Sequence, residues 1–288
     1  MAAELKPLFP GLGVELKGFD PNRLDEAAAE VFRQAFRDHR IVLLRDVELS
    51  DEAGVALTET LGPVSFKSPF MRKGGGRKFS YVSNQHADGT LRDGELLFHA
   101  DHSFLPWPLK AISLYAMQVP ETGGETLFTD AAAAYARLPE RLKARVAGLG
   151  ARHVANYNLF EGDGRPRYDP ASGAKAAVHP VVWPHPESGA PILFVSRLLT
   201  ERILELSPEE SEELLLELFT YVEDEAHAYE HRWRAGDYLV WDNRQLQHSR
   251  RDFDPAATRA LRRTPIDDPL DPTAGTGLRN PDTKDRAH

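Results

Sequence analysis

Apolar residues recur with helical spacing in only a few parts of the chain. Residues 24–38 place apolar side chains three and four positions apart, which predicts an amphipathic helix. Residues 57–61 predict the end of a second helix, because a Gly-Pro pair follows them directly. A third helical stretch covers residues 130–149, and Pro139 is suited to the first turn of its second half.

The clearest helix start lies at Ser207. Ser207 is a good N-cap, Pro208 takes the first helical position, and Glu210 completes a capping box. Apolar residues within 214–222 then form one stripe along the helix. Such a stripe is more often part of a core than a partner surface. Self-association through an exterior helix stays open as the alternative.

Short apolar runs elsewhere predict strands. Residues 41–44 form a buried run, residues 112–117 alternate between apolar and small or polar side chains, and residues 238–241 follow a turn. The predicted fold class is therefore mainly β with flanking helices. Residues 65–96 and 156–177 lack such patterns and predict long loops, and a loop of this length inside a compact domain is usually either a functional lid or disordered.

No internal repeat or domain boundary is evident, so we predict a single domain over residues 1–268. Residues 269–288 are rich in Pro, Asp, Gly and Thr, which predicts a flexible C-terminal tail. His227 and His231 lie four apart and could chelate a metal on a helix face. No third ligand is in view, so we interpret them as solvated residues where that helix ends.

The composition is that of an ordinary soluble globular protein of 288 residues, with 41% hydrophobic and 27% charged residues. The formal net charge of -9 argues against nucleic acid and anionic membrane partners. The absence of cysteine excludes disulfides and thiolate metal sites. Neither a signal peptide nor an apolar run of membrane-spanning length is present, so we expect a cytoplasmic location.

The chemistry of the chain centres on His99 and Asp101, with His248 far downstream. Side chains two residues apart on an extended segment point to the same face, because strand side chains alternate. A second histidine from a remote strand would complete a set of two imidazoles and one carboxylate. That set leaves three positions of an octahedral ferrous ion open, as oxygenases require. Arg259 and Arg263 follow His248 and suit the binding of a dicarboxylate and an acidic substrate.

Several motifs, in order and over nearly the whole chain, resemble the taurine dioxygenase and 2,4-dichlorophenoxyacetate dioxygenase family of ferrous-iron, 2-oxoglutarate-dependent oxygenases. They are Leu61-Gly62-Pro63, His99-Ala100-Asp101-His102-Ser103-Phe104, Gly123-Gly124-Glu125-Thr126-Leu127-Phe128, His179-Pro180-Val181-Val182, Trp241-Asp242-Asn243-Arg244 with His248, and Arg259-Ala260-Leu261-Arg262-Arg263. The resemblance implies a double-stranded β-helix, or jelly roll. In it, His248 would lie on a strand facing His99 and Asp101 across the barrel mouth.

The resemblance also implies the role of each site residue. His99, Asp101 and His248 would bind Fe(II), and O2 and 2-oxoglutarate would be cosubstrates. Arg259 and Thr126 would hold the far carboxylate of 2-oxoglutarate. Related halogenases lack the carboxylate ligand, so its presence in this chain predicts oxygenation or desaturation.

Arg263 corresponds to an arginine that binds the acidic group of the primary substrate in several relatives, and alternation places Arg262 on the opposite face. In the rest of the predicted substrate pocket, Asn84 is retained relative to the taurine enzymes. The departures from those enzymes, which put taurine itself in doubt, are Lys67, Phe70, Asn158, Leu159 and Leu199.

We therefore predict a dioxygenase that hydroxylates a C–H bond of a small anionic substrate, a carboxylate or a sulfonate, with 2-oxoglutarate converted to succinate and CO2. One alternative is the same cofactor chemistry leading to desaturation of an amino-acid-derived substrate. Another is a jelly-roll protein that binds metal and a small acid without catalysis. The oligomeric state, a dimer or a tetramer among the options, is left open.

Overall fold

The computed structural model describes residues 4–68, 71, 77–91, 94–155, 166 and 168–275. Its helices are α1 (Glu26–His39), α2 (Asp51–Glu59), α4 (Ala131–Arg137), α5 (Glu140–Val146) and α6 (Pro208–Val222), with 3-10 turns η1 (Pro170–Ser172) and η2 (Glu225–His227). Strands make up most of the remaining regular structure, as the sequence predicts. Among the described residues, none of the helices has the length and apolarity of a membrane span.

Two larger sheets form the centre of the molecule. The seven-stranded sheet has the order β1 (Glu4–Phe9), β2 (Leu12–Lys17), β3 (Ile41–Leu44), β14 (Tyr238–Asp242), β6 (Ala111–Gln118), β16 (Ala260–Ile266) and β4 (Ser80–Ser83). The four-stranded sheet has the order β13 (Tyr229–His231), β7 (Thr126–Asp130), β15 (Leu246–Arg250) and β5 (Leu96–His99). Two smaller sheets are formed by β12 (Thr200–Ile203), β8 (Gly150–Val154) and β9 (Ala176–Pro180), and by β10 (Val182–Pro184) with β11 (Pro191–Leu193).

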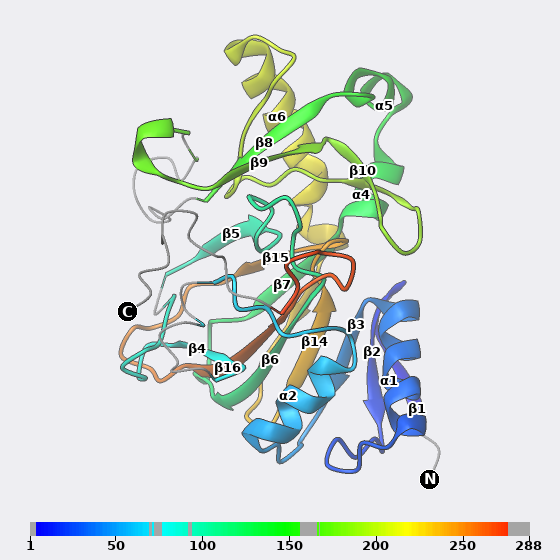
Figure 1. Ribbon diagram of the computed structural model, residues 1–288, viewed down its shortest axis with the longest axis vertical. Helices are drawn as coiled ribbons and strands as arrows, with labels where there is room; N and C mark the ends of the chain where they lie inside the picture. Colours follow the sequence, from blue (N-terminus) through cyan, green and yellow to red (C-terminus); the bar gives the residue numbers. More distant parts are fainter. Residues whose placement is uncertain are drawn as a thin grey trace, which may run out of the picture.

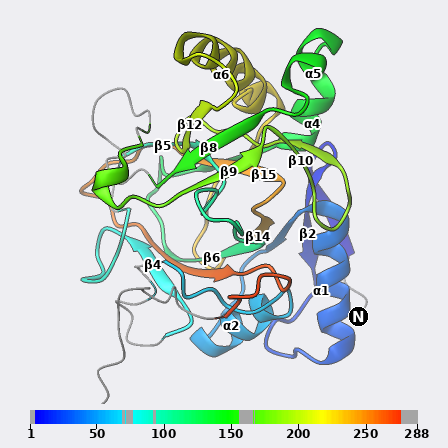
Figure 2. The same cartoon turned by 45° about the horizontal axis from the view of Figure 1, so that its top comes forward.

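These elements are arranged in layers, with the helices outside (Figures 1 and 2). Helices α1 and α2 cover the outer face of the seven-stranded sheet, where Phe32 and Tyr238 share one apolar cluster. Trp241 and Phe128, one from each of the two larger sheets, meet in a second cluster between them. A third cluster joins α4, α5 and α6 to β8 and β12. Burial of apolar side chains on both sides of the central strands is the main stabilising contribution to this arrangement.

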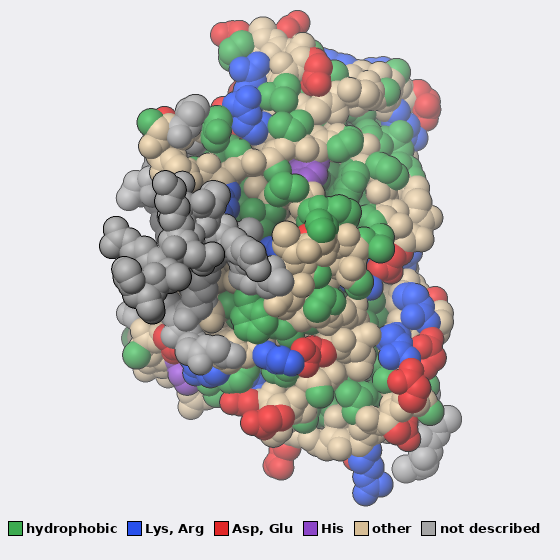
Figure 3. Space-filling view, viewed as in Figure 1, with side chains coloured by type: hydrophobic (Ala, Val, Ile, Leu, Met, Phe, Trp, Pro, Cys, Tyr) green, Lys and Arg blue, Asp and Glu red, His purple; other side chains and the backbone are tan. Residues whose placement is uncertain are grey.

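The strongest helix predictions are confirmed. Helix α1 spans Glu26–His39, and its outward face carries ion pairs such as Arg33 Nε to Glu30 Oε2 at 2.8 Å. Figure 3 shows Lys, Arg, Asp and Glu side chains interspersed over this helix. Ser207 and Glu210 form the predicted capping box at the start of α6, and the apolar stripe of α6 is buried.

The predicted helical stretch 130–149 is two helices. Pro139 is the N-cap of α5 and not a residue of its first turn. The residue before a proline is pushed out of the helical region, and Leu138 accordingly has an extended ψ of 136°. The proline therefore separates α4 from α5.

The interpretation of His231 as a solvated helix-end residue is wrong. Helix α6 ends at Val222, whereas His231 lies on β13 and is fully buried, with its Nε2 3.2 Å from Asp237 Oδ2. His227 is exposed in η2, as expected, and pairs with Asp224. The two histidines therefore share no helix face.

The predicted loop regions are described only in part. Residues 65–96 contain strand β4, and residues 176 and 177 of the second region begin β9. Asn158 and Leu159 lie outside the described residues. In the predicted tail, Asp271 is buried and pairs with Lys67. The boundary at residue 268 and the flexibility of 269–288 stay predictions.

Candidate active site

The two predicted metal-binding histidines are direct cross-strand neighbours. Strands β5 and β15 are antiparallel, and His99 is paired with His248 in their register. Directly opposite residues project to the same face of a sheet, and the two ring centroids are 4.2 Å apart. The expectation that His248 faces His99 across the barrel mouth is therefore wrong, because both lie in the four-stranded sheet.

Asp101 is held by a turn and not by an extended strand. Strand β5 ends at His99, and a turn begins at Asp101. The Asn243 side chain fixes this turn: Oδ1 accepts from the backbone N–H of Asp101 at 2.8 Å, and Nδ2 donates to the carbonyl of Asp101 at 2.9 Å. Strand alternation predicted the correct partner for His99 but the wrong backbone conformation.

The hydrogen bonds and charges around the three side chains suit metal binding. Nδ1 of His99 lies 2.8 Å from the carbonyl of Leu97, which favours a proton there and leaves Nε2 with a free electron pair. Burial, reinforced by the nearby His99, lowers the pKa of His248 to about 3. Burial opposes ionisation of Asp101, but the neighbouring Arg263 guanidinium holds its pKa well below the usual range. At neutral pH the site therefore offers a neutral imidazole at His248 and a carboxylate at Asp101.

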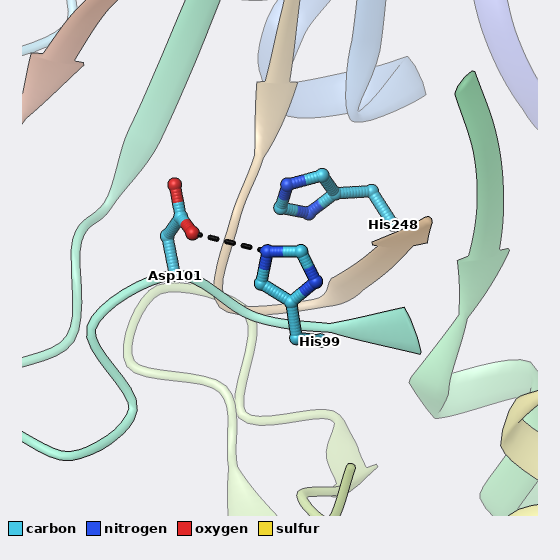
Figure 4. A group of neighbouring side chains, drawn as sticks. All are labelled: His99, Asp101 and His248. Carbon is cyan, nitrogen blue, oxygen red and sulfur yellow. Dashed lines mark ion pairs between the residues drawn. The ribbon is translucent and has the colours of Figure 1, made fainter. Parts of the chain in front are cut away.

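The donor atoms of His99, Asp101 and His248 all lie within 4.8 Å of one another. Figure 4 shows both imidazoles and the carboxylate side by side; His99 is the last residue of β5, and His248 lies in the middle of β15. Nε2 of His99 is 3.2 Å from Asp101 Oδ1, the contact drawn there as a dashed line. Two imidazoles and one carboxylate are the donor set of ferrous oxygenases, so the three side chains fit Fe(II).

This group opens into a cavity between the two larger sheets. The wall combines apolar side chains with three arginines, and its residues are Val82, Leu91, Leu96, His99, Asp101, Leu114, Thr126, Trp241, His248, Ser249, Arg250, Arg259 and Arg263. Asp101 is the only carboxylate in this set. The cavity therefore carries excess positive charge, which suits anionic ligands.

Arg259 is a buried cation without a carboxylate partner within ion-pair distance among the described residues. One nitrogen donates to the carbonyl of Gly124 at 3.2 Å, and Nε has no hydrogen-bond partner in the described part of the chain. Burial, with a smaller effect of Arg250, lowers the pKa of Arg259 to about 9, so the group remains a cation at neutral pH. An unpaired buried charge is costly, and an incoming carboxylate would compensate it.

The glycine pair before Thr126 lets the backbone approach Arg259 closely. Gly124 has a φ of +71°, and a Cβ atom there would lie 2.9 Å from Nε of Arg259. Phe253 packs against the same guanidinium, with its ring centroid 5.8 Å from Cζ. Any larger residue at position 124 would therefore displace the arginine.

Thr126 lies at the start of β7 and is buried in the same cavity wall as Arg259. Its hydroxyl oxygen accepts a hydrogen bond from the indole nitrogen of Trp233 at 3.0 Å. The structure thus brings Thr126 and Arg259 to one cavity, although residues 126 and 259 are remote in sequence.

Arg263 contacts the metal site directly. One guanidinium nitrogen donates to Asp101 Oδ2 at 2.6 Å, on the carboxylate oxygen that does not contact His99. Arg262 projects to the other face of β16, where it pairs with Asp51, as alternation predicts. Arg259 and Arg263 therefore share the cavity, but among the described residues only Arg263 has a carboxylate partner there.

The predicted substrate-pocket residues are more scattered. Lys67 is buried in ion pairs with Asp271 and with Asp267, the latter at 3.0 Å, so binding a substrate would require these pairs to open. Asn84 accepts from the backbone N–H of Arg259 at 3.0 Å and holds the loop before it. Leu199 is buried in a turn before β12 and is not part of the cavity wall described above. Phe70 lies outside the described residues.

Sequence reasoning did not assign roles to three residues that shape the site. Asn243 clamps Asp101, Trp233 contacts Thr126, and Arg250 donates to the carbonyls of Leu91 and Gly94 beside the cavity. Asn243 lies within the motif Trp241-Asp242-Asn243-Arg244, and Arg250 is two residues from His248 on the same strand. Those positions are the sequence signal that could have identified both.

Comparison with known proteins agrees with this geometry. The family model described as taurine catabolism dioxygenase TauD, TfdA family, matches residues 4–264. The (S)-phenoxypropionate/alpha-ketoglutarate-dioxygenase of Sphingobium herbicidovorans is 30% identical over 293 residues, which cover 95% of this chain and 98% of that protein. The alpha-ketoglutarate-dependent 2,4-dichlorophenoxyacetate dioxygenase of Cupriavidus pinatubonensis is 30% identical over 292 residues, with 93% and 99% covered.

Solved structures show the same fold. A taurine dioxygenase from Burkholderia xenovorans superposes with a TM-score of 0.77 at 29% identity, covering 93% of this chain and 90% of that one. AAD-2 in complex with Mn(II) and N-oxalylglycine also gives a TM-score of 0.77, at 26% identity, with 93% and 98% covered. These relatives are named as enzymes and do not support a non-catalytic binding protein. The chain belongs to the TauD/TfdA family of oxidoreductases that depend on Fe(II), 2-oxoglutarate and O2.

Proposed function

We propose that this protein is a dioxygenase that hydroxylates a C–H bond of a small anionic substrate while converting 2-oxoglutarate to succinate and CO2. The observation that carries the proposal is one cavity with the His99, Asp101 and His248 cluster and the buried Arg259, which has no carboxylate partner among the described residues. We assign the two facing sheets, with the candidate metal site in the cavity between them, to a double-stranded β-helix, or jelly roll.

His99, Asp101 and His248 would hold the metal through three protein ligands and leave the remaining positions for cosubstrate and O2. Iron bound there supplies the oxidising chemistry for the substrate C–H bond. The Arg259 guanidinium would take the far carboxylate of 2-oxoglutarate as a charge-assisted pair, and the Thr126 hydroxyl would donate to the same group. The cavity walls would position the reacting carbon and exclude water.

Arg263 is our candidate for binding the acidic group of the substrate. Its guanidinium lies beside Asp101, so a substrate anion that it binds would be close to the metal centre. The named substrates of the relatives, phenoxypropionate and 2,4-dichlorophenoxyacetate, are carboxylates. We propose a small carboxylate or sulfonate as the substrate class. The names of these relatives do not favour desaturation of an amino-acid-derived substrate.

Lys67, Phe70, Asn84 and Leu199 stay proposed substrate-pocket residues. The side chains of Lys67 and Asn84 are bonded to other parts of the protein, so these residues would affect substrate binding by positioning neighbouring segments and not by direct contact. A cytoplasmic location, a single domain over residues 1–268 and self-association also stay proposals.

The test is succinate formation from 2-oxoglutarate by the iron-loaded protein under O2, with a panel of aryloxyacetates, other carboxylates and sulfonates. We expect one acidic class to stimulate succinate formation. His99→Ala should abolish the reaction, whereas the exposed control His227→Ala should retain it. Full turnover by His99→Ala would refute the metal assignment, and stimulation by neutral compounds alone would refute the substrate class.

A further inference from the structure

Trp233 is bonded to a group that the proposed function places against the cosubstrate. Its indole nitrogen lies 3.0 Å from the hydroxyl oxygen of Thr126. Thr126 is paired with His231 across β7 and β13, and Trp233 is two positions beyond His231. Trp233 therefore approaches Thr126 from the neighbouring chain segment, outside the residues that form the cavity wall.

The chemistry of the two groups fixes the direction of this hydrogen bond. An indole nitrogen can only donate, whereas a threonine hydroxyl has one hydrogen to donate and two electron pairs that accept. Trp233 therefore occupies an acceptor position on Thr126 and leaves the hydroxyl hydrogen free for another partner. In the cavity, that partner would be the anion held by Arg259.

The Trp233 ring also packs against a second aromatic side chain. The His231 ring meets it edge to face, with the centroids 4.4 Å apart. The Tyr229 hydroxyl lies 2.9 Å from Nδ1 of His231, and the Asp237 carboxylate lies 3.2 Å from Nε2 without hydrogen-bond geometry. Arg45 in turn pairs with Asp237 at 2.6 Å. These buried contacts pack against the indole ring while its N–H donates to Thr126.

We propose that Trp233 is a positioning residue for the cosubstrate, acting through the hydroxyl of Thr126. The inference rests on the proposed function, because it takes the Thr126 partner to be the far carboxylate of 2-oxoglutarate or of an analogue. Without the indole donor, the hydroxyl is free to rotate and to turn its hydrogen away from the carboxylate. The loss should appear as weaker cosubstrate binding and not as a changed reaction.

The test is a double-mutant cycle on N-oxalylglycine binding to the Mn(II)-loaded protein, measured by calorimetry. Trp233→Phe should weaken binding by roughly 2- to 10-fold, as expected for one neutral hydrogen bond. In a Thr126→Val background the acceptor is gone, and Trp233→Phe should change the affinity by less than about 2-fold. Thr126→Ser keeps the hydroxyl and should restore the full sensitivity to Trp233→Phe.

The control is Trp183→Phe, which changes a tryptophan that packs on Phe194 away from the cavity wall. It should leave the affinity unchanged. An equal loss from Trp233→Phe in the wild-type and Thr126→Val backgrounds would overturn the inference, since the effect would then not pass through Thr126. Unchanged binding in Trp233→Phe would also overturn it. A wild-type protein that fails to bind N-oxalylglycine would instead refute the proposed function.

A second measurement does not depend on the folding of Trp233→Phe. The chain has four tryptophans, so the Trp233 indole N–H resonance can be assigned by elimination, with Phe substitutions at the other three. Thr126→Val should shift the Trp233 resonance towards the position of a free indole, and N-oxalylglycine should shift it in the wild-type protein only. A Trp233 resonance that shifts neither in Thr126→Val nor on addition of N-oxalylglycine would contradict the proposed contact.

Discussion

Arg259 and Arg263 lie four residues apart and line the same cavity, yet their surroundings differ. Arg259 has no carboxylate within ion-pair distance among the described residues, and Gly124 and Phe253 enclose it tightly. Arg263 is paired with Asp101, a metal-ligand candidate, at 2.6 Å. A buried cation without a counter-ion favours an incoming anion, whereas a paired cation must exchange one partner for another. The comparison supports our proposal that Arg259 binds the cosubstrate and that Arg263, paired with Asp101, binds the substrate.

The largest expected effect on activity comes from removing Asp101, the carboxylate that pairs with Arg263 and not with Arg259. Asp101→Ala deletes a metal ligand and the partner of Arg263, so we expect no measurable succinate formation. Metal binding, measured by calorimetry with Mn(II), should also be lost. Asp224→Ala, which removes a carboxylate paired with the exposed His227, is the matched control and should retain both properties. Full turnover by Asp101→Ala would contradict the assignment of Asp101.

The second-largest expected effect comes from replacing Arg259, which has no carboxylate partner among the described residues. Arg259→Met should weaken N-oxalylglycine binding by roughly 10- to 100-fold, because a charge-assisted pair is lost. The ligand-free protein should become more stable by about 1 kcal/mol, since an uncompensated buried charge is replaced by an apolar side chain. Calorimetry and denaturant unfolding measure the two quantities. Lower stability of ligand-free Arg259→Met would show that the arginine has a partner that we have not recognised.

The same substitution at Arg263 should have the opposite effect on stability. Arg263→Met removes the cation paired with Oδ2 of Asp101, so the free energy of unfolding of the metal-free protein should fall by about 1–3 kcal/mol. The KM of the acidic substrate should rise by roughly 10-fold or more, with the N-oxalylglycine affinity nearly unchanged. If Arg259→Met and Arg263→Met change the free energy of unfolding in the same direction, the difference between an unpaired and a paired arginine does not explain the stability changes.

The smallest effect concerns the close packing around Arg259. Gly124→Ala should weaken N-oxalylglycine binding by roughly 3- to 10-fold, because the new Cβ would lie 2.9 Å from Nε of Arg259. Gly148→Ala is the matched control: its φ of +76° imposes the same backbone strain, but no atom lies within 4 Å of the added Cβ. Equal losses of affinity in both variants would assign the effect to backbone strain and not to the arginine.

Local patterns in the sequence determined much of this protein. Helix α1 and the capped start of α6 follow from apolar spacing and from Ser207 and Glu210, because such signals act within a few residues. The motif around His99 and Asp101, with His248, supplied the metal-ligand candidates before any spatial information was available. Alternation along β16 separated Arg262 from Arg263 because the side-chain period of a strand is fixed.

Only the tertiary structure decided how these segments meet. The pairing of β5 with β15 makes His99 and His248 direct neighbours, and the Asn243 clamp places Asp101 in a turn. His231, which in the sequence resembles a residue at a helix end, is buried on β13 and packs against Trp233. Lys67 is buried in ion pairs with Asp267 and Asp271. The reason is physical: periodicity reports which face of an element is apolar, whereas strand register and ion-pair partners depend on contacts between segments far apart in the chain.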